Sequence, residues 1–220
     1  MTTTLASGPH PNGTRPKAAS GRPNRAVSRP VTITLLHPKG GVGRSTSAYM
    51  LGAELALRSH RVALVDRDQG QHLSRIVEYY PPGLDTLLLG DRDDVDVRVI
   101  DTAPEVDVGR ALRYLREADW ALVPVKGPEA GSVLALPLLL DWLDQAAGAR
   151  LLGFLPTMFK ARRAESRQWL EELQKIAAQR GVPVFPPIGD LASLASYRLD
   201  GHPYAPIAEA VEQVLRAAAI

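Results

Sequence analysis

The chain has 220 residues, a formal net charge of +2 and 45% hydrophobic residues, which suits one domain with a sizeable core and a tail. It contains no cysteine, so disulfides, thiolate zinc sites and iron–sulfur clusters are excluded. No apolar run approaches the length of a membrane span, and no hydrophobic segment follows the basic start. We therefore expect a cytoplasmic protein with no signal peptide and no membrane-spanning segment.

The first 30 residues differ in composition from the rest of the chain. They are rich in Pro, Gly, Ser, Thr and Asn and carry five basic residues and no acid, so the remainder has a net charge of −3. Such a segment buries too little apolar surface to offset its ordering entropy, so residues 1–30 are expected to form a disordered basic tail. The composition fits a weak polyanion-binding arm and a solvated leader equally well.

From residue 31 onward, short apolar segments alternate with helical patterns. Strands are expected at 31–36, 61–65, 96–100, 120–124, 151–155 and 182–185. Helices are expected at 47–57, 71–80, 108–117, 132–147, 164–180, near 191–197 and at 207–218, with Pro137 bending the fourth of them. This alternation predicts an α/β fold with helices on both faces of a mostly parallel, twisted sheet, and it assigns residues 31–220 to one domain.

A glycine-rich turn, Pro-Lys-Gly-Gly-Val-Gly-Arg-Ser-Thr at 38–46, joins the first strand to the first helix. We call it the phosphate loop, because the unpaired N–H groups of such a turn and the helix N-terminus after it favour phosphate binding. The general pattern is G-x-x-x-x-G-K-[ST]. Aligned on Gly43, its first glycine falls at Pro38 and its lysine at Arg44, and Lys39 is an additional cation.

Three acids follow predicted strands, at the sheet edge where ligands bind in folds of this kind. Asp66 and Asp68 come after the second strand and Asp101 after the third. A lone acid in this position is more often a turn former or a helix cap. For Asp101, its order after the phosphate loop favours a functional role instead.

The loop sequence Lys-Gly-Gly-Val-Gly-Arg-Ser-Thr resembles the deviant P-loop of the ParA/MinD family of ATPases, in which an early second lysine is diagnostic. The resemblance implies a P-loop NTPase fold with ATP and Mg²⁺ as cofactors. It also implies that Lys39 reaches the partner's phosphates across an ATP-dependent homodimer, and that Ser45 holds Mg²⁺. The nucleotide-binding residues of the loop would be Lys39, Gly40, Gly41, Val42, Gly43, Arg44, Ser45 and Thr46.

The acids extend this resemblance. Asp101, followed by Thr-Ala-Pro, is similar to the family's Walker B aspartate and would hold Mg²⁺ together with Ser45. The segment Asp-Arg-Asp-Gln at 66–69 resembles the family's Asp-x-Asp-Pro-Gln switch, which makes Asp68 the residue that orients the attacking water and places Asp66 nearer the metal. The motif's Pro and Gln are replaced by Gln69 and Gly70, so the missing glutamine would be supplied by Gln69 or Gln71.

Further segments match up to the C-terminal part, so that the resemblance covers about 190 residues. Leu-Val-Pro-Val at 122–125 and Gly-Phe-Leu-Pro-Thr-Met at 153–158 are similar to the family's segments after later strands. Pro-Ile-Gly-Asp at 187–190 occupies the place where a backbone turn lies against adenine, which implies base contacts from Met158 and Ile188. The short gap between Asp68 and Asp101 resembles the compact plasmid-partition members.

Arg44 departs from the family's lysine. Lysine is a compact point charge, whereas arginine is a longer planar fork. Because phosphoryl transfer depends almost wholly on placement, we expect Arg44 to preserve ATP binding and to impair hydrolysis. The catalytic residues implied by the resemblance are Lys39, Asp68 and Arg44.

A basic cluster precedes and begins the helix at 164–180, and it consists of Lys160, Arg162, Arg163 and Arg167. Family members bind DNA non-specifically through basic residues in this half of the chain, so the cluster is our candidate, although a solvated helix face fits the charge pattern equally well. No helix-turn-helix signal is present, which argues against sequence-specific readout. The five histidines lack ligand-like spacing and predict no metal site.

The resemblance as a whole implies a nucleoid-associated DNA-partition ATPase with a ParB-type partner. Two alternatives remain: a nucleotide-gated module with poor hydrolysis, because of Arg44, and a MinD-like positioning protein. The final 13 residues contain one arginine and two glutamates, which is unlike a basic membrane-binding helix. We therefore expect no membrane partner.

Overall fold

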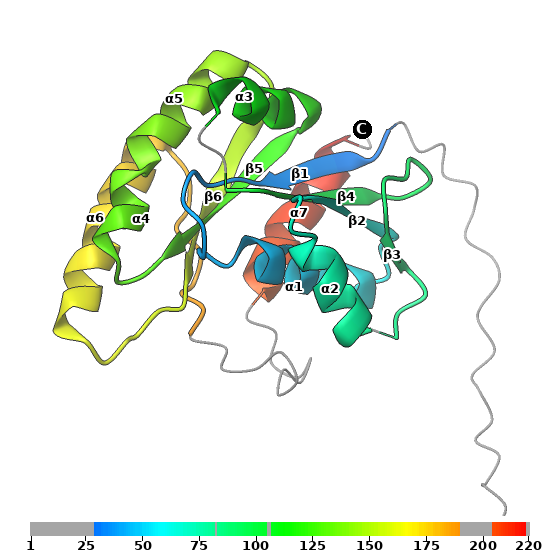
Figure 1. Cartoon of the computed structure of the whole chain (residues 1–220), viewed down its shortest axis with the longest axis horizontal. Helices are drawn as coiled ribbons and strands as arrows, with labels where there is room; N and C mark the ends of the chain where they lie inside the picture. The colour runs from blue at the N-terminus through cyan, green and yellow to red at the C-terminus, as the bar shows by residue number, and fades with distance from the viewer. Residues whose placement is uncertain (1–28, 82, 105–106, 190–203, 219–220) are drawn as a thin grey trace, which may run out of the picture.

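The structure is a computed structural model that describes residues 29–81, 83–104, 107–189 and 204–218. In these ranges, six parallel strands form one sheet in the order β3-β2-β4-β1-β5-β6. Helices cover both faces of the sheet (Figure 1). The predicted fold class is therefore confirmed. The strands are β1 (Val31–Leu35), β2 (Val62–Arg67), β3 (Leu87–Leu89), β4 (Val97–Thr102), β5 (Trp120–Lys126) and β6 (Arg150–Thr157).

The helices form two layers that bury separate apolar clusters against the sheet. The first cluster joins α1 and α7 to one face of the strands, and the second joins α3, α5 and α6 to the other face. Figure 1 shows α2 beside α1, and α4 in the layer of α5 and α6. The bounds are α1 (Arg44–Leu57), α2 (His72–Tyr79), α3 (Val108–Glu117), α4 (Ala130–Leu134), α5 (Leu136–Ala146), α6 (Ala164–Arg180) and α7 (Ala205–Ala218).

Residue alternation explains how β1 serves both cores. Val31, Ile33 and Leu35 are buried in the α1 and α7 cluster, while the intervening threonines face the other way, as the two-residue period of a strand requires. β1 lies between β4 and β5: the chain runs from β1 to β2 and β3 on one side, returns to β4, and then crosses β1 to β5 and β6 on the other side, so the direction of the connections reverses beside β1. This is the position where an open parallel sheet forms a ligand crevice at the carboxyl ends of its strands.

Several predicted elements differ from the observed ones. The helix expected at 132–147 is two helices that meet at Ala135, and Pro137 lies in the first turn of α5 instead of bending a continuous helix. Proline is well tolerated in a first turn because that N–H has no helical acceptor. The strand expected at 182–185 is reduced to a bridge between Phe154 and Val184. The edge strand β3 was not predicted, because three leucines give no alternation.

The remaining elements follow the predictions closely, and α3 and α6 have the expected bounds. β2 and β4 each end two residues later than expected, so Asp66 and Asp101 lie within the strands. The predicted helix near 191–197 and nearly all of the predicted tail lie outside the described residues. No helix in the described ranges is long and apolar enough to cross a membrane.

Candidate functional site

The phosphate loop curves between β1 and α1 at the carboxyl edge of the sheet. Gly41 and Gly43 have φ angles of 69° and 82°, a left-handed conformation that favours glycine, and Gly43 is the N-cap of α1. Thr157 at the end of β6 donates its hydroxyl to the Val42 carbonyl at 2.8 Å. No acid occupies the first turn of α1, so the field at its N-terminus is positive. The loop is therefore shaped and charged to hold an anion.

The side chain of Arg44 stabilises the phosphate loop through hydrogen bonds to backbone carbonyls. Its side chain is buried, with 6% of the residue exposed. Nε donates to the Thr102 carbonyl at 2.9 Å, and Nη1 donates to the carbonyls of His37 and Lys39, both at 2.8 Å. Burial lowers the pKa of Arg44, and the charges of Asp101 and Asp68 oppose that shift. The guanidinium therefore links the loop to the end of β4, while its predicted phosphate contact stays a prediction.

His37, which no sequence pattern singles out, fixes the same loop from the other side. It is fully buried, and its Nδ1 accepts the N–H of Lys39 at 3.0 Å. Nε2 must then carry the proton, and it donates to the Ser132 carbonyl of α4 at 3.0 Å. Burial is the main cause that lowers the pKa of His37 to about 4. The neutral imidazole of His37 thus connects the loop to α4. A single histidine before a proline has no pattern in the sequence that indicates this role.

Lys39, the predicted cross-dimer lysine, is held within its own chain. Its ammonium group forms an ion pair with Glu129, the N-cap of α4, and Glu129 also pairs with Lys126 at 3.1 Å. Both Lys39 and Glu129 are partly exposed. The ammonium lies close over Gly131, where a Cβ atom would come within 2.8 Å of Nζ. The Lys39 side chain therefore packs against α4 at the surface. Glu129, its partner, is a second residue that no sequence pattern singles out.

Asp101 is an acidic residue that lies fully buried at this edge of the sheet. Neither of its carboxylate oxygens forms a hydrogen bond of normal geometry within the described residues, although the Ser45 hydroxyl lies close enough to favour the ionised form. Burial raises its pKa to about 7; Ser45 and Arg44 oppose the shift, and the nearby carboxylates add to it. Leu35 and Asp66 are its register neighbours on the two adjacent strands. A buried carboxylate without a partner is costly unless a cation or a donor completes it.

These residues fit a magnesium ion bound with a nucleotide. Mg²⁺ prefers oxygen ligands and commonly takes one or two carboxylates together with substrate phosphates and waters. Asp101, Ser45 and Asp66 offer such oxygens beside the loop. Within the described ranges, no group of three or more acidic or histidine side chains forms a metal site by itself. The protein residues would thus hold the ion only together with the phosphates, whose charge the ion would neutralise.

Asp66 and Asp68 organise the segment between β2 and α2, which we call the switch segment (residues 66–72). Asp66 accepts the Asp68 N–H at 3.0 Å, and its other oxygen accepts the N–H and the hydroxyl of Ser74, both at 2.8 Å. Asp68 accepts the Gly70 N–H at 3.0 Å and contacts Nδ1 of His72 at 2.7 Å. Burial is the largest single effect on the pKa of Asp68 and raises it. The hydrogen bonds from Gly70 and His72, together with nearby positive charge, outweigh burial, so the pKa is lowered overall.

The expected substitute for the motif's glutamine is not visible in this arrangement. In the described part of the chain, the side chains of Gln69 and Gln71 make no hydrogen bond, and both residues are exposed. His72, the first residue of α2, is the side chain that contacts Asp68. Asp68 lies before α2, so the four-residue spacing of the two residues is not that of a helical pair, and no sequence pattern indicates this contact.

The predicted base contacts surround a small cavity of about 60 Å³ beside the phosphate loop. Met158 and Ile188 line it together with Gly43 and Thr46 of the loop. A larger cavity of about 820 Å³ lies at the amino ends of β1, β5 and β6, lined by Arg29, Trp120 and Arg150 among others, and contains none of the predicted site residues. The residues predicted to bind nucleotide are therefore brought together at one edge of the sheet.

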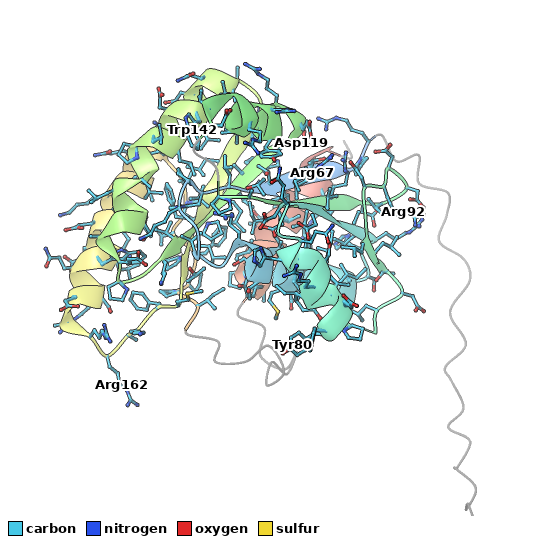
Figure 2. All side chains as sticks on the ribbon, viewed as in Figure 1. Arg67, Tyr80, Arg92, Asp119, Trp142 and Arg162 are labelled. Atoms are coloured by element: carbon cyan, nitrogen blue, oxygen red, sulfur yellow. The ribbon has the colours of Figure 1, made fainter. Side chains whose placement is uncertain are left out.

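The basic cluster lies apart from this edge, in the loop after β6 and the first turn of α6. Figure 2 shows Arg162 pointing away from the ribbon. All four side chains (Lys160, Arg162, Arg163 and Arg167) are exposed, and none has a hydrogen bond or an ion pair within the described residues. The loop itself is ordered by the hydroxyl of Ser166, which donates to the Lys160 carbonyl at 2.6 Å. The cluster therefore presents unpaired positive charge to solvent.

Comparisons with known proteins place this geometry in a family. A plasmid partition protein from Borrelia burgdorferi bound to AMPPNP is 18% identical with a TM-score of 0.66, and the match covers 87% of this chain and 100% of that one. Cobyrinic acid a,c-diamide synthase from Mycobacterium smegmatis, with an ATP analogue and magnesium, is 22% identical with a TM-score of 0.65 over 86% and 97% of the two chains. A variant of McdA from Cyanothece, in complex with ATP, is 17% identical with a TM-score of 0.64 over 84% and 98%.

At these identities the structural likenesses establish the fold alone, and a search of curated proteins gave no match. A family model matches most of the chain, because residues 33–204 fit the CobQ/CobB/MinD/ParA nucleotide binding domain. That range includes the phosphate loop, the switch segment, Asp101 and the basic cluster. The chain therefore belongs to the CobQ/CobB/MinD/ParA family of nucleotide-binding domains.

Proposed function

We propose that this protein is a ParA-like ATPase that segregates DNA: Mg·ATP closes a sandwich homodimer, and the dimer binds DNA without sequence specificity. A ParB-type partner would stimulate hydrolysis and return the dimer to monomers, and the DNA-bound form would lie on the nucleoid. The observation that carries the proposal is Asp101, whose two buried carboxylate oxygens lack a hydrogen bond of normal geometry within the described residues, beside Ser45 and the phosphate loop. A carboxylate of this kind suits the Mg²⁺ of a bound nucleotide.

Each part of the site has a role in this proposal. The loop N–H groups and the N-terminus of α1 would bind the phosphates, and Met158 and Ile188 would contact the base. Asp68 would orient the attacking water, with Asp66 holding the switch segment against α2. Mg²⁺ would neutralise phosphate charge between Ser45 and Asp101. Arg44 would keep the loop in place, since its donors contact loop carbonyls.

Dimerisation requires the Lys39 side chain to leave its ion pair with Glu129 and to reach the partner subunit. In the single chain its ammonium is paired with Glu129, and its backbone N–H is fixed by His37. Only the Lys39 side chain would therefore move, because the Lys39 backbone is already fixed by its hydrogen bond to His37. Bound ATP in a partner subunit offers more negative charge than one carboxylate, so we expect the exchange to occur only when nucleotide is present.

The proposal predicts a dimer that depends on ATP and on Lys39. Light scattering of the wild-type chain with Mg²⁺ and a slowly hydrolysed ATP analogue should give the dimer mass, and ADP should give the monomer mass. Lys39→Ala should stay monomeric while still binding the analogue. A dimer of equal stability in the absence of nucleotide, or in Lys39→Ala, would contradict the proposed sandwich.

A second candidate is a nucleotide-gated switch that hydrolyses ATP very slowly, and one observation favours it. The cation at the position of the P-loop lysine has two of its three nitrogens engaged by backbone carbonyls, so it is less available to the transition state. ATP turnover measured with and without DNA and the partner separates the two candidates. Turnover that DNA and the partner stimulate supports the partition ATPase, and binding without turnover supports the gated switch.

A further inference from the structure

The switch segment contains a histidine–carboxylate pair that neither the motif nor the proposed roles explain. Nδ1 of His72 lies 2.7 Å from Oδ2 of Asp68, and Oδ1 of Asp68 accepts the N–H of Gly70 at 3.0 Å. We propose that His72 is a positioning residue for ATP hydrolysis, which holds the Asp68 carboxylate in the orientation that meets the attacking water. This inference rests on the proposed hydrolysis and assigns to it a residue that the family motif lacks.

The backbone at Gly70 is what allows the imidazole to reach Asp68. A Cβ atom at Gly70 would come within 2.6 Å of Cε1 and 2.8 Å of Nδ1 of His72, which is closer than real Cβ atoms approach other atoms. The ring therefore occupies the space that a side chain at position 70 would need. In the family's motif this position holds glutamine. The imidazole of His72 thus fills the space in which that side chain would begin, and it contacts the Asp68 carboxylate.

The hydrogen bonding leaves Asp68 able to accept a water. Each carboxylate oxygen has two lone pairs, and the structure shows one donor at each oxygen. Because an ionised carboxylate is an acceptor only, Nδ1 of His72 must carry the proton in this contact. The Asp68 side chain is 12% exposed and the His72 side chain 63% exposed, so water reaches the pair from one side. Two donors then fix the rotation of Asp68, and its remaining lone pairs can accept the attacking water.

A merely structural role would be a surface contact that stabilises the start of α2. The two roles make different predictions, because a partly exposed ion pair adds little to stability. Misplacement of a catalytic group by about 1 Å, in contrast, costs up to about 10²-fold in rate. His60 provides a matched control, since its Nε2 contacts the carboxylate of Glu212 at 3.1 Å between the end of α1 and α7, away from the nucleotide edge.

The test is steady-state ATP turnover of the full chain with Mg²⁺, together with ATP affinity and thermal unfolding. His72→Ala should lower kcat on the order of 10-fold or more, with little change in the KM for ATP or in the unfolding temperature. His72→Asn should recover most of the rate, because its amide N–H lies near the position of Nδ1. His60→Ala should leave kcat unchanged even if it lowers the unfolding temperature.

Gly70→Ala provides an independent arm, because it keeps both residues, Asp68 and His72, but displaces the His72 ring. It should lower kcat as His72→Ala does, and it should cause no further loss in the His72→Ala background, as expected for two changes that act through one contact. Equal kcat in wild type and His72→Ala, or fully additive losses in the double variant, would overturn the inference and leave the proposed function standing. A wild-type chain that binds no ATP, or turns none over, would overturn the proposed hydrolysis and the inference with it.

Discussion

The nucleotide edge and the basic cluster both concentrate charge, but they hold it in opposite ways. At the nucleotide edge, Arg44 and His37 are buried and each is hydrogen-bonded at fixed geometry. In the basic cluster, Arg163 and Arg167 are exposed and have no partner in the described part of the chain. Fixed, desolvated groups act through their exact placement at the site. Exposed cations act through their charge, which salt screens. The comparison predicts that the first region depends on the shape of its side chains and the second on their charge.

The largest effect concerns the buried imidazole of His37. Its folded-state pKa of about 4 lies below the ordinary 6.5, so the unfolded chain binds more protons between these pH values. The stability that neutral His37 supports is complete above about pH 6.5 and is lost as the pH falls toward 4, by about 3 kcal/mol. Urea unfolding between pH 4 and 7 measures this loss. His37→Gln should reduce it by most of that amount, and an unchanged pH dependence would contradict the assignment.

Arg44→Lys tests whether shape matters at the nucleotide edge. The change keeps the charge but removes the fork that contacts three carbonyls, and it restores the residue of the general P-loop pattern. We expect turnover to rise about 10²-fold, on the order of 2.7 kcal/mol, with a much smaller change in the ATP dissociation constant. Adding Asp68→Ala should remove the gain. Unchanged turnover in Arg44→Lys would show that arginine serves the transition state as well as lysine.

The same conservative change should be silent in the basic cluster. Replacing Arg163 and Arg167 by lysine should leave the salt dependence of DNA binding unchanged, because the charge is kept. Replacing both by glutamate should reduce the slope of log K against log[salt] by about 2, at about 0.9 for each phosphate that is no longer neutralised. Arg113→Glu with Arg116→Glu on α3 is the control of equal charge change and should have no effect. A cluster that is sensitive to lysine substitution would remove the contrast between the two regions.

The smallest effect concerns the ion pair that holds Lys39 on its own chain. Glu129 is partly exposed, and exposed pairs are worth about 0.2–1 kcal/mol. Glu129→Gln should therefore lower the ATP concentration needed for half-maximal dimerisation by about 2- to 5-fold. Light scattering across an ATP titration measures it, with Glu165→Gln on α6 as a control. A higher requirement for ATP in Glu129→Gln would mean that Glu129 assists the dimer.

The sequence predicted the sheet, most helices and the residues gathered at the nucleotide edge, because these depend on local patterns. Alternating apolar residues define the strands, and glycines define the phosphate loop. The roles of His37, Glu129 and His72 were not predictable in the same way. His37 and Glu129 act through contacts with segments distant in the sequence, which no local pattern records. His72 lies four residues after Asp68 but on a helix that Asp68 precedes, and the space beside Gly70 that its ring fills is visible only in three dimensions.

Nucleotide is expected to control DNA binding, and fluorescence anisotropy of a labelled random-sequence duplex tests this dependence most directly. The wild-type chain and Lys39→Ala are each titrated onto the duplex with Mg²⁺ and a slowly hydrolysed ATP analogue, with Mg·ADP, and without nucleotide. Tight binding is expected only for the wild-type chain with the ATP analogue, because two basic clusters act together only in the dimer. Equal binding in all three nucleotide conditions, or undiminished binding by Lys39→Ala, would contradict it.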